Sequence, residues 1–247
     1  MCLPMINHYR DVDLIPLTEE KLLVIACDSC GAIGDKELDQ VKISPYYVGQ
    51  STARVVIMEI MSVGANPVAL TAAICNENQP TGEQILEGIR EELAQAGFSQ
   101  IPITISTEKN MVTQQTGLGI SVVAICEKEN LRIGKSQIGD IVYVVGVPKV
   151  GDEVVQDQGK IADCRVLRQI LNIQGVRDII PVGSQGIVGE CRKLATYLGG
   201  QFQRLSPLDI NIEKSAGPCT TIVFTDPYEI DLQGKVEVPY FCVGKIM

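Results

Sequence analysis

The chain has 247 residues, of which 45% are hydrophobic and 21% are charged, so it is a folded protein with one large domain or two small ones. Its net charge of −9 excludes nucleic acids and anionic membranes as partners, because both are bound by clustered lysines and arginines. It has no secretion signal at the N-terminus and no apolar run that would cross a membrane, so we expect a cytoplasmic protein.

The first half of the chain is predicted to alternate between strands and helices. Ser44 followed by Pro45 is typical of a helix start and Gly64 of a helix end, which predicts a helix over about 47–63. The next helix is expected to bury Ile85, Ile89 and Leu93. The other expected elements are strands over 21–28, 67–75, 101–107 and 116–126 and that second helix over 81–98.

The polar, glycine-containing stretch 127–140 is expected to separate two domains, 1–130 and 131–247. Strands and helices alternate again in the second domain, so we predict an α/β (α+β) protein of two such domains. The elements expected there are strands over 139–148, 176–183, 219–227 and 236–244 and helices over 160–173 and 185–200.

Nine cysteines are scattered along the chain without the spacing of a disulfide framework, so most are expected to be reduced and buried. Cys27 and Cys30 form one C-x-x-C pair, which leaves a zinc or redox site as an alternative. A structural zinc ion needs four ligands, and the sequence offers neither a second such pair nor any histidine besides His8.

The stretch 28–39 carries four acids, Asp28, Asp35, Glu37 and Asp39, directly after the first apolar strand. Asp28 ends a run that is too apolar to tolerate an unpartnered charge. It is interpreted either as a metal ligand or as the cap of a turn, since Asp followed by Ser and Gly is common in turns.

Glu59 lies in a helix that is apolar on nearly every face, so it needs a counter-charge or a metal ion unless it sits at an exposed edge. Arg54 is five residues away, outside the favourable i,i+4 spacing, and is therefore not an obvious partner.

Glu108, Lys109 and Asn110 follow a strand and precede the Gly117-x-Gly119 pair, which alone is a weak phosphate signal. A carboxylate, an amine and backbone amides at a strand end suit a metal-bound phosphate. Asp28, Glu59 and Glu108 come from three elements of one predicted sheet, and carboxylates gathered there would require a cation such as Mg²⁺.

Three segments in this order, "IACDSCGAIG", "EIMSVGANPVAL" and "ISTEKNMVTQQTGLGISVVAI", resemble the aminoimidazole ribonucleotide (AIR) synthetase-related, PurM-like superfamily. The likeness is good over 22–148 and loose elsewhere. It implies an N-terminal domain that binds ATP and Mg²⁺ through acidic residues and a second α/β domain. It also implies a homodimer whose N-terminal mixed sheets form a shared barrel.

Within this resemblance, Asp28, Glu59 and Glu108 match the family's acids and are implied to be metal ligands. The sequence departs from the family where Ser106 and Thr107 stand in place of Gly-Gly. It departs again at Gln185, where several relatives have Asp, which puts a metal role for that position in doubt.

The "STEKN" motif and the short N-terminus most resemble bacterial alpha-ribazole kinases, which phosphorylate the 5′-hydroxyl of alpha-ribazole in cobalamin lower-ligand salvage. The resemblance implies a Mg-ATP-dependent kinase acting on a nucleoside-like molecule. An ATP-dependent ligase or cyclase of the AIR synthetase type and a non-catalytic nucleotide-binding protein are the alternatives.

Phosphoryl transfer depends mainly on positioning and on neutralising charge. Lys36, Arg54 and Lys109 are candidate phosphate contacts, and the lysines have solvated surface charge as the alternative. Asn110 and Gly117 are expected to lie at the nucleotide. Asp35 is either a further ligand or the base that accepts the proton of the acceptor hydroxyl.

Overall fold

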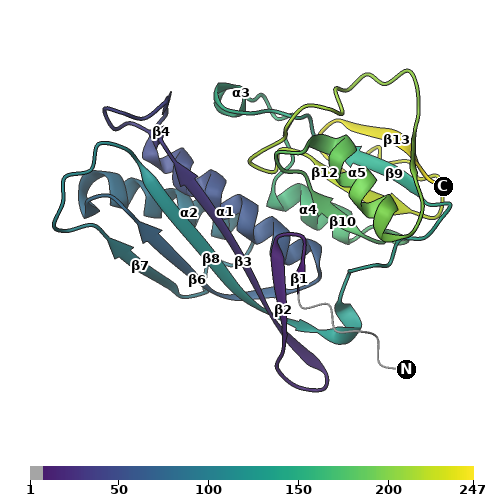
Figure 1. Ribbon diagram of the computed structural model, residues 1–247, viewed down its shortest axis with the longest axis horizontal. Helices are drawn as coiled ribbons and strands as arrows, with labels where there is room; N and C mark the ends of the chain where they lie inside the picture. The colour runs from purple at the N-terminus through teal and green to yellow at the C-terminus, as the bar shows by residue number, and fades with distance from the viewer. Residues whose placement is uncertain (1–7) are drawn as a thin grey trace. The chain divides into compact units, whose positions relative to one another are not determined.

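The computed structural model describes residues 8–247, so Cys2 and most of the N-terminal stretch inspected for a secretion signal lie outside the described residues. The chain divides into two compact units, Met1–Leu131 and Arg132–Met247 (Figure 1). We call them the first unit and the second unit, by their order in the chain. Within residues 8–247, no helix has both the length and the apolar character that a membrane crossing requires.

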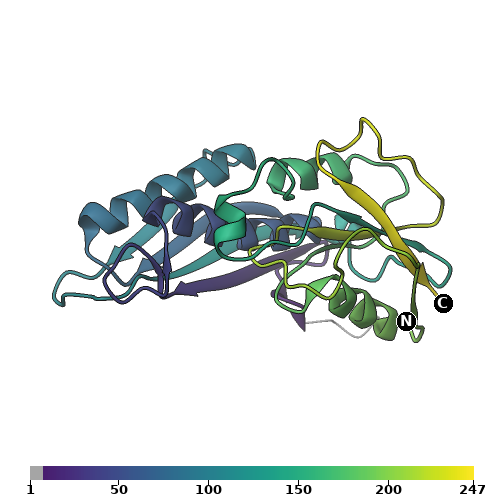
Figure 2. The same cartoon turned by 90° about the horizontal axis from the view of Figure 1, so that it is seen from above.

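The first unit is a mixed sheet with two helices on one face (Figures 1 and 2). Its strands lie in the order β1-β2-β3-β8-β6-β7, and β6 and β7 form its parallel pair. Its elements are β1 (His8–Tyr9), β2 (Val12–Pro16), β3 (Lys21–Gly31), β4 (Ile33–Gly34), β5 (Val41–Lys42), α1 (Pro45–Ser62), β6 (Asn66–Ile74), η1 (Asn78–Gly82), α2 (Glu83–Gln95), β7 (Ile103–Thr107), β8 (Gly117–Glu127) and η2 (Lys128–Asn130).

Helix α1 begins and ends at the predicted signals. The Ser44 hydroxyl accepts a hydrogen bond from the Tyr46 amide at 3.3 Å, and Pro45 fills the first helical position, where no amide hydrogen is needed. After α1 the chain reverses through Gly64, whose φ of 84° favours glycine. The prediction of this helix is confirmed.

Helices α1 and α2 pack closely because each carries a glycine at the contact. A Cβ atom at Gly49 would lie 2.0 Å from the Ile85 carbonyl oxygen, and one at Gly88 would lie 1.9 Å from the Tyr46 carbonyl oxygen. Ile85, Ile89 and Leu93 are buried, as predicted for α2. The two helices therefore form one layer over the sheet.

The sequence indicated that the first strand ends at Asp28, and this prediction is wrong. In the structure, β3 continues to Gly31 in an unbroken pairing with β8. The side chains of β3 alternate between the two faces of the sheet. Val24, Ala26 and Asp28 lie on the helix-covered face, and Ile25 and Cys27 lie on the other face. The strand continues because β8 pairs with it as far as Gly117, the partner of Gly31. Asp28 is therefore a strand residue, not a turn cap.

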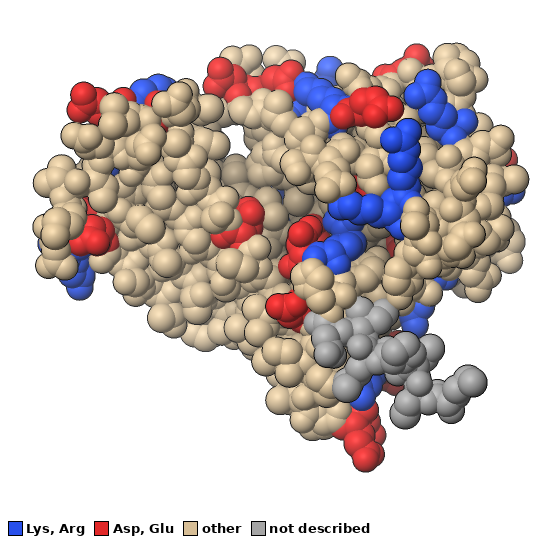
Figure 3. Space-filling view, viewed as in Figure 1, with Lys and Arg blue, Asp and Glu red and all other residues tan. Residues whose placement is uncertain are grey.

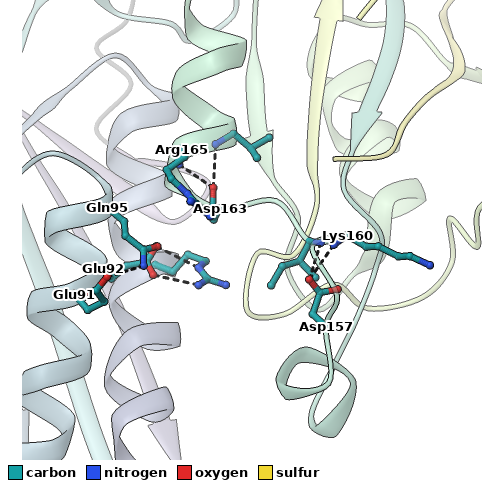
Figure 4. A network of polar contacts seen from close by, with 10 residues as sticks. Glu91, Glu92, Gln95, Asp157, Lys160, Asp163 and Arg165 are labelled. Atoms are coloured by element: carbon teal, nitrogen blue, oxygen red, sulfur yellow. Dashed lines mark hydrogen bonds and ion pairs between the residues drawn. The ribbon is translucent and has the colours of Figure 1, made fainter. Parts of the chain in front are cut away.

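The second unit is a sheet in the order β10-β12-β9-β13-β11, and all of these pairings are antiparallel. Helix α5 packs on one face, and Figure 2 shows α4 on the opposite side. Asp163 caps α4 by accepting hydrogen bonds from the Arg165 and Val166 amides (Figure 4). The elements are β9 (Ile141–Val145), α3 (Asp152–Val155), α4 (Cys164–Leu171), β10 (Ile179–Pro181), α5 (Gly186–Tyr197), β11 (Phe202–Arg204), β12 (Ile222–Asp226) and β13 (Tyr240–Ile246).

The cysteines of residues 8–247 form no disulfide with one another, and only half of them are buried. Cys27 and Cys30 lie three positions apart in one strand, so their side chains leave opposite faces of the sheet. That geometry does not allow the pair to chelate one zinc ion. Burial raises the pKa of Cys126 to about 11, which keeps this thiol protonated and unreactive.

Candidate active site

Several of the predicted site residues lie along one edge of the first unit's sheet. Strands β3, β6 and β7 run in the same direction, so all three end at this edge, where β8 begins. We call this edge, with the loops 32–44, 75–82 and 108–116, the loop edge (Figure 1). Asp35, Lys36, Glu108, Lys109 and Asn110 all lie on these loops.

The loop edge does not bring the three predicted metal ligands together. Asp28 lies in one cross-strand row with Ile120, Ala72 and Ile105, three strands away from β7. At the usual strand spacing, this separates β3 from β7 by roughly 14 Å. Within residues 8–247, no three His, Cys, Asp or Glu side chains are close enough to hold a metal ion.

Asp28 is a half-buried carboxylate on the face of the sheet that α1 covers. Burial raises its pKa above the ordinary value, a hydrogen bond from the Ser29 backbone partly offsets this, and the nearby charge of Asp11 raises it further. Because both burial and Asp11 disfavour its ionised form, Asp28 would gain strongly from a bound cation.

Glu59 and Arg54 are both buried in α1 and have different partners. Arg10 Nη2 lies 3.5 Å from Glu59 Oε1. The Arg54 guanidinium donates two hydrogen bonds to the Glu92 carboxylate of α2, Nε to Oε1 at 3.2 Å and Nη2 to Oε2 at 3.1 Å (Figure 4 labels Glu92). These contacts agree with the prediction that Arg54 is not an obvious partner of Glu59. Arg54 binds Glu92 within the first unit.

The loop 32–44 is fixed by two acid contacts. Lys36 Nζ donates to both oxygens of Glu77 at 2.6 and 2.7 Å, which ties this loop to the loop 75–82. Asp39 is buried and accepts hydrogen bonds from the Thr116 amide and hydroxyl, both at 2.7 Å. Gly34 approaches the same hydroxyl so closely that an added Cβ would lie 2.1 Å from it. Asp39 therefore holds the loop in place.

Glu108 forms its own turn after β7. Its Oε1 accepts hydrogen bonds from the Asn110 amide at 2.6 Å and the Met111 amide at 3.1 Å, and these bonds lower the pKa of Glu108. Lys109 and Asn110 are exposed on this turn. The turn thus presents an ionised carboxylate, an ammonium group and a side-chain amide at the loop edge.

Asp35 lies in an exposed loop, whereas Gly117 belongs to a strand. Asp35 is exposed in the loop that follows β4. Gly117 is the first residue of β8, and its amide donates to Asn76 Oδ1 at 3.0 Å, so the Gly117-x-Gly119 pair opens a strand. Gln185, where relatives have an acid, precedes the first residue of α5 in the second unit.

Asn76 is a central residue of the loop edge that the sequence did not indicate. It is fully buried, and its side chain donates to the Thr113 hydroxyl at 2.7 Å and to the Gln115 carbonyl at 2.8 Å. Its own carbonyl accepts from the Glu108 amide at 2.9 Å. Asn76 thereby fixes both ends of the loop that carries Lys109. An asparagine directly after a strand resembles any turn residue, so only its contacts reveal this role.

The segment that contains the loop edge is similar to a known family. Residues 9–126 match the family "AIR synthase related protein, N-terminal domain". This match confirms the predicted likeness to the AIR synthase-related superfamily for the segment that carries Asp28, Glu59 and Glu108. No curated protein matches the chain.

Solved structures share the fold of the whole chain. AaThiL, the thiamine monophosphate kinase from Aquifex aeolicus, complexed with AMPPCP and TMP, has a TM-score of 0.65 at 15% identity, over 96% of this chain and 84% of that chain. Hydrogenase maturation protein HypE in complex with ATP has a TM-score of 0.64 at 12% identity, over 96% and 79%. Thermotoga maritima PurL complexed with ATP has a TM-score of 0.61 at 12% identity. The match covers 96% of this chain but only 37% of PurL. The predicted two-domain PurM-like fold is confirmed.

Proposed function

We propose that this protein is a Mg-ATP-dependent small-molecule kinase that phosphorylates the 5′-hydroxyl of alpha-ribazole. The observation that carries the proposal is the loop edge itself. Glu108 and Lys109 lie there, and Asp28 lies on β3, three positions before this strand ends at Gly31; all are within the segment 9–126 that matches the AIR synthase-related domain. The acceptor is proposed from the resemblance of "STEKN" to the corresponding motif of alpha-ribazole kinases.

The similar structures support nucleotide use. AaThiL was solved with AMPPCP and TMP, and HypE and PurL were each solved with ATP. ThiL is named a kinase, and this chain covers 84% of its length. At 12–15% identity these structures share the fold, and ATP as co-substrate is carried over to this chain as part of the proposal.

We assign Asp28 and Glu108 to separate contacts with Mg²⁺, because β3 and the end of β7 are too far apart for both carboxylates to bind one ion. Asp28 is a half-buried carboxylate whose ionised form needs a cation, and Glu108 keeps its Oε2 in addition to the oxygen that binds the turn amides. When bound, Mg²⁺ would neutralise phosphate charge. Glu59 is engaged with Arg10 and is not assigned to this role.

The remaining roles belong to exposed residues of the loop edge. Lys109 and Asn110 are placed on the Glu108 turn, where an ammonium group and an amide donate to phosphate oxygens. Asp35 is exposed and is assigned as the base that accepts the proton of the acceptor hydroxyl. Lys36 is held by Glu77, so its predicted phosphate contact would require that pair to open.

A homodimer is part of the proposal, with a second copy covering the uncovered face of the first sheet. Ile15 and Val68 are 45% and 40% exposed, and Ile25 and Val123 are partly exposed on paired strands. Figure 3 shows few Lys, Arg, Asp or Glu side chains over this sheet. Such an apolar face is typical of an interface. Sedimentation as a 26.8 kDa monomer at micromolar concentration would exclude this dimer.

ATP is expected to stabilise the protein only in the presence of a divalent ion. With ATP at about a hundred times its Kd, binding adds about 2.7 kcal/mol, which raises the melting temperature by roughly 5–10 °C. Differential scanning fluorimetry with ATP plus Mg²⁺ and with ATP plus EDTA measures the effect. Equal shifts in both buffers would remove Mg²⁺ from the account.

A ligase or cyclase of the AIR synthetase type is the second candidate, because the structure also resembles PurL complexed with ATP. The two activities differ in the fate of the phosphate. A kinase leaves it on the product as a phosphomonoester, whereas a ligase that activates an amide oxygen releases it as inorganic phosphate. A nucleotide-binding protein without turnover would show the thermal shift but form no ADP.

A further inference from the structure

The turn between β1 and β2 holds an arginine in an unusual conformation. Tyr9 pairs with Val12, so Arg10 and Asp11 form a two-residue connection. Arg10 has φ of 55°, in the left-handed region that residues with a side chain rarely adopt, and its side chain is only 13% exposed. A strained, largely buried arginine persists only where surrounding contacts fix it.

Arg10 contacts the buried acid of α1. Arg10 Nη2 lies 3.5 Å from Glu59 Oε1, and the Glu59 side chain is 6% exposed. Its helix neighbours Met58 and Ile60 are fully buried as well, so Glu59 belongs to a buried segment of α1. A buried carboxylate costs several kcal/mol unless a cation compensates it, which gives Arg10 a clear energetic role.

We infer that Arg10 is the resident cation of Glu59, so that this chain neutralises the acid with its own guanidinium and not with a divalent ion. Residues 8–247 offer no group of three metal-ligating side chains at Glu59 or elsewhere. A divalent ion at Glu59 would have to displace the guanidinium, because two cations beside one buried carboxylate repel each other. The fit to a family metal ligand therefore fails at Glu59.

Arg10 also lies beside a second acid, its neighbour in the turn. Arg10 Nη2 is 3.9 Å from Asp11 Oδ2, but the Asp11 side chain is 70% exposed, whereas that of Glu59 is 6% exposed. Because water screens an exposed ion pair, Glu59 is the acid that depends on the guanidinium.

Thermal unfolding in EDTA tests the ion pair. Arg10→Met removes the guanidinium from buried Glu59, and we expect the melting temperature to fall by roughly 5–10 °C. The double variant Arg10→Met, Glu59→Gln should regain most of that loss, because neither charge remains. Arg90→Met and Glu87→Gln, which change exposed residues of α2, are the matched controls and should leave the melting temperature unchanged.

Mn²⁺ titration without nucleotide, followed by electron paramagnetic resonance, tests the metal. We expect Glu59→Gln to bind Mn²⁺ as wild type does. Arg10→Met should bind it about tenfold more tightly, an effect absent from the double variant. The inference is overturned if Glu59→Gln weakens Mn²⁺ binding about tenfold while Arg10→Met changes neither Mn²⁺ affinity nor melting temperature. Neither measurement involves ATP turnover, so both outcomes are independent of the proposed kinase activity.

Discussion

Asp28→Asn is expected to lower the formation of ADP and phosphomonoester by about a hundredfold or more. That loss corresponds to about 2.7 kcal/mol in the barrier, because the amide cannot hold a cation against the phosphates. Coupled ADP detection with Mg-ATP and alpha-ribazole measures it. The exposed Asp209→Asn in the second unit is the matched control and should keep the wild-type rate.

The same variant is expected to keep or gain stability, with a defined pH dependence. Burial raises the pKa of Asp28 in the folded protein, so the folded state binds its proton more tightly than the unfolded chain does. The destabilisation is therefore present above the raised pKa and fades as the pH falls through it. Asp28→Asn removes it, so its advantage in melting temperature should be larger at pH 8 than at acidic pH. A variant with wild-type turnover would contradict the assignment of Asp28.

Arg54→Met is expected to destabilise the protein by about 3–5 kcal/mol, because it removes the guanidinium from a fully buried carboxylate. Glu92 has 0% side-chain exposure and bonds to Arg54 through both oxygens. Urea unfolding measures the loss, and Arg90→Met on the exposed face of α2 is its control. Replacing both partners, as Arg54→Met with Glu92→Met, should recover much of the stability.

The two interpretations of Arg54 give opposite results. If Arg54 stabilises the contact between α1 and α2, Arg54→Met loses stability with and without ATP. If Arg54 instead binds phosphate, as the sequence suggested, the variant would unfold normally without nucleotide and lose only the stabilisation by Mg-ATP. The second result would contradict a structural role for the pair.

Local signals in the sequence predicted the helices well. Ser44 and Pro45 define the start of α1 through a side-chain cap and a residue without an amide hydrogen, and both act within one turn. Ile85, Ile89 and Leu93 predicted the buried face of α2 because their spacing follows the helical period.

Strand limits and pairing were less predictable because they depend on partners far along the chain. β3 continues past Asp28 because β8 pairs with it as far as Gly31, whose partner Gly117 is 86 positions further along the chain. β2 was missed although Val12 and Leu14 alternate with exposed residues, since its charged residue and proline are unusual for a strand. Alternation of strands and helices in the second half likewise did not reveal that its sheet is antiparallel.

In the candidate site, too, local sequence signals were predictive and long-range contacts were not. Sequence indicated that Glu59 needs a counter-charge, but its partner Arg10 is 49 positions away and could not be identified. Among the acids that follow β3, nothing in the sequence distinguishes exposed Asp35 from buried Asp39, which binds Thr116 across the loop edge. Residue type predicted which side chains are polar and important, whereas tertiary contacts decide which are structural.

The central claim is tested most directly by mass spectrometry of alpha-ribazole after incubation with the protein and Mg-ATP. The account predicts that the nucleoside gains one phosphate and that ADP forms in equal amount. Unmodified nucleoside with free phosphate would contradict the kinase and favour a ligase or ATPase. No ADP with alpha-ribazole or any other nucleoside would contradict an enzymatic role altogether.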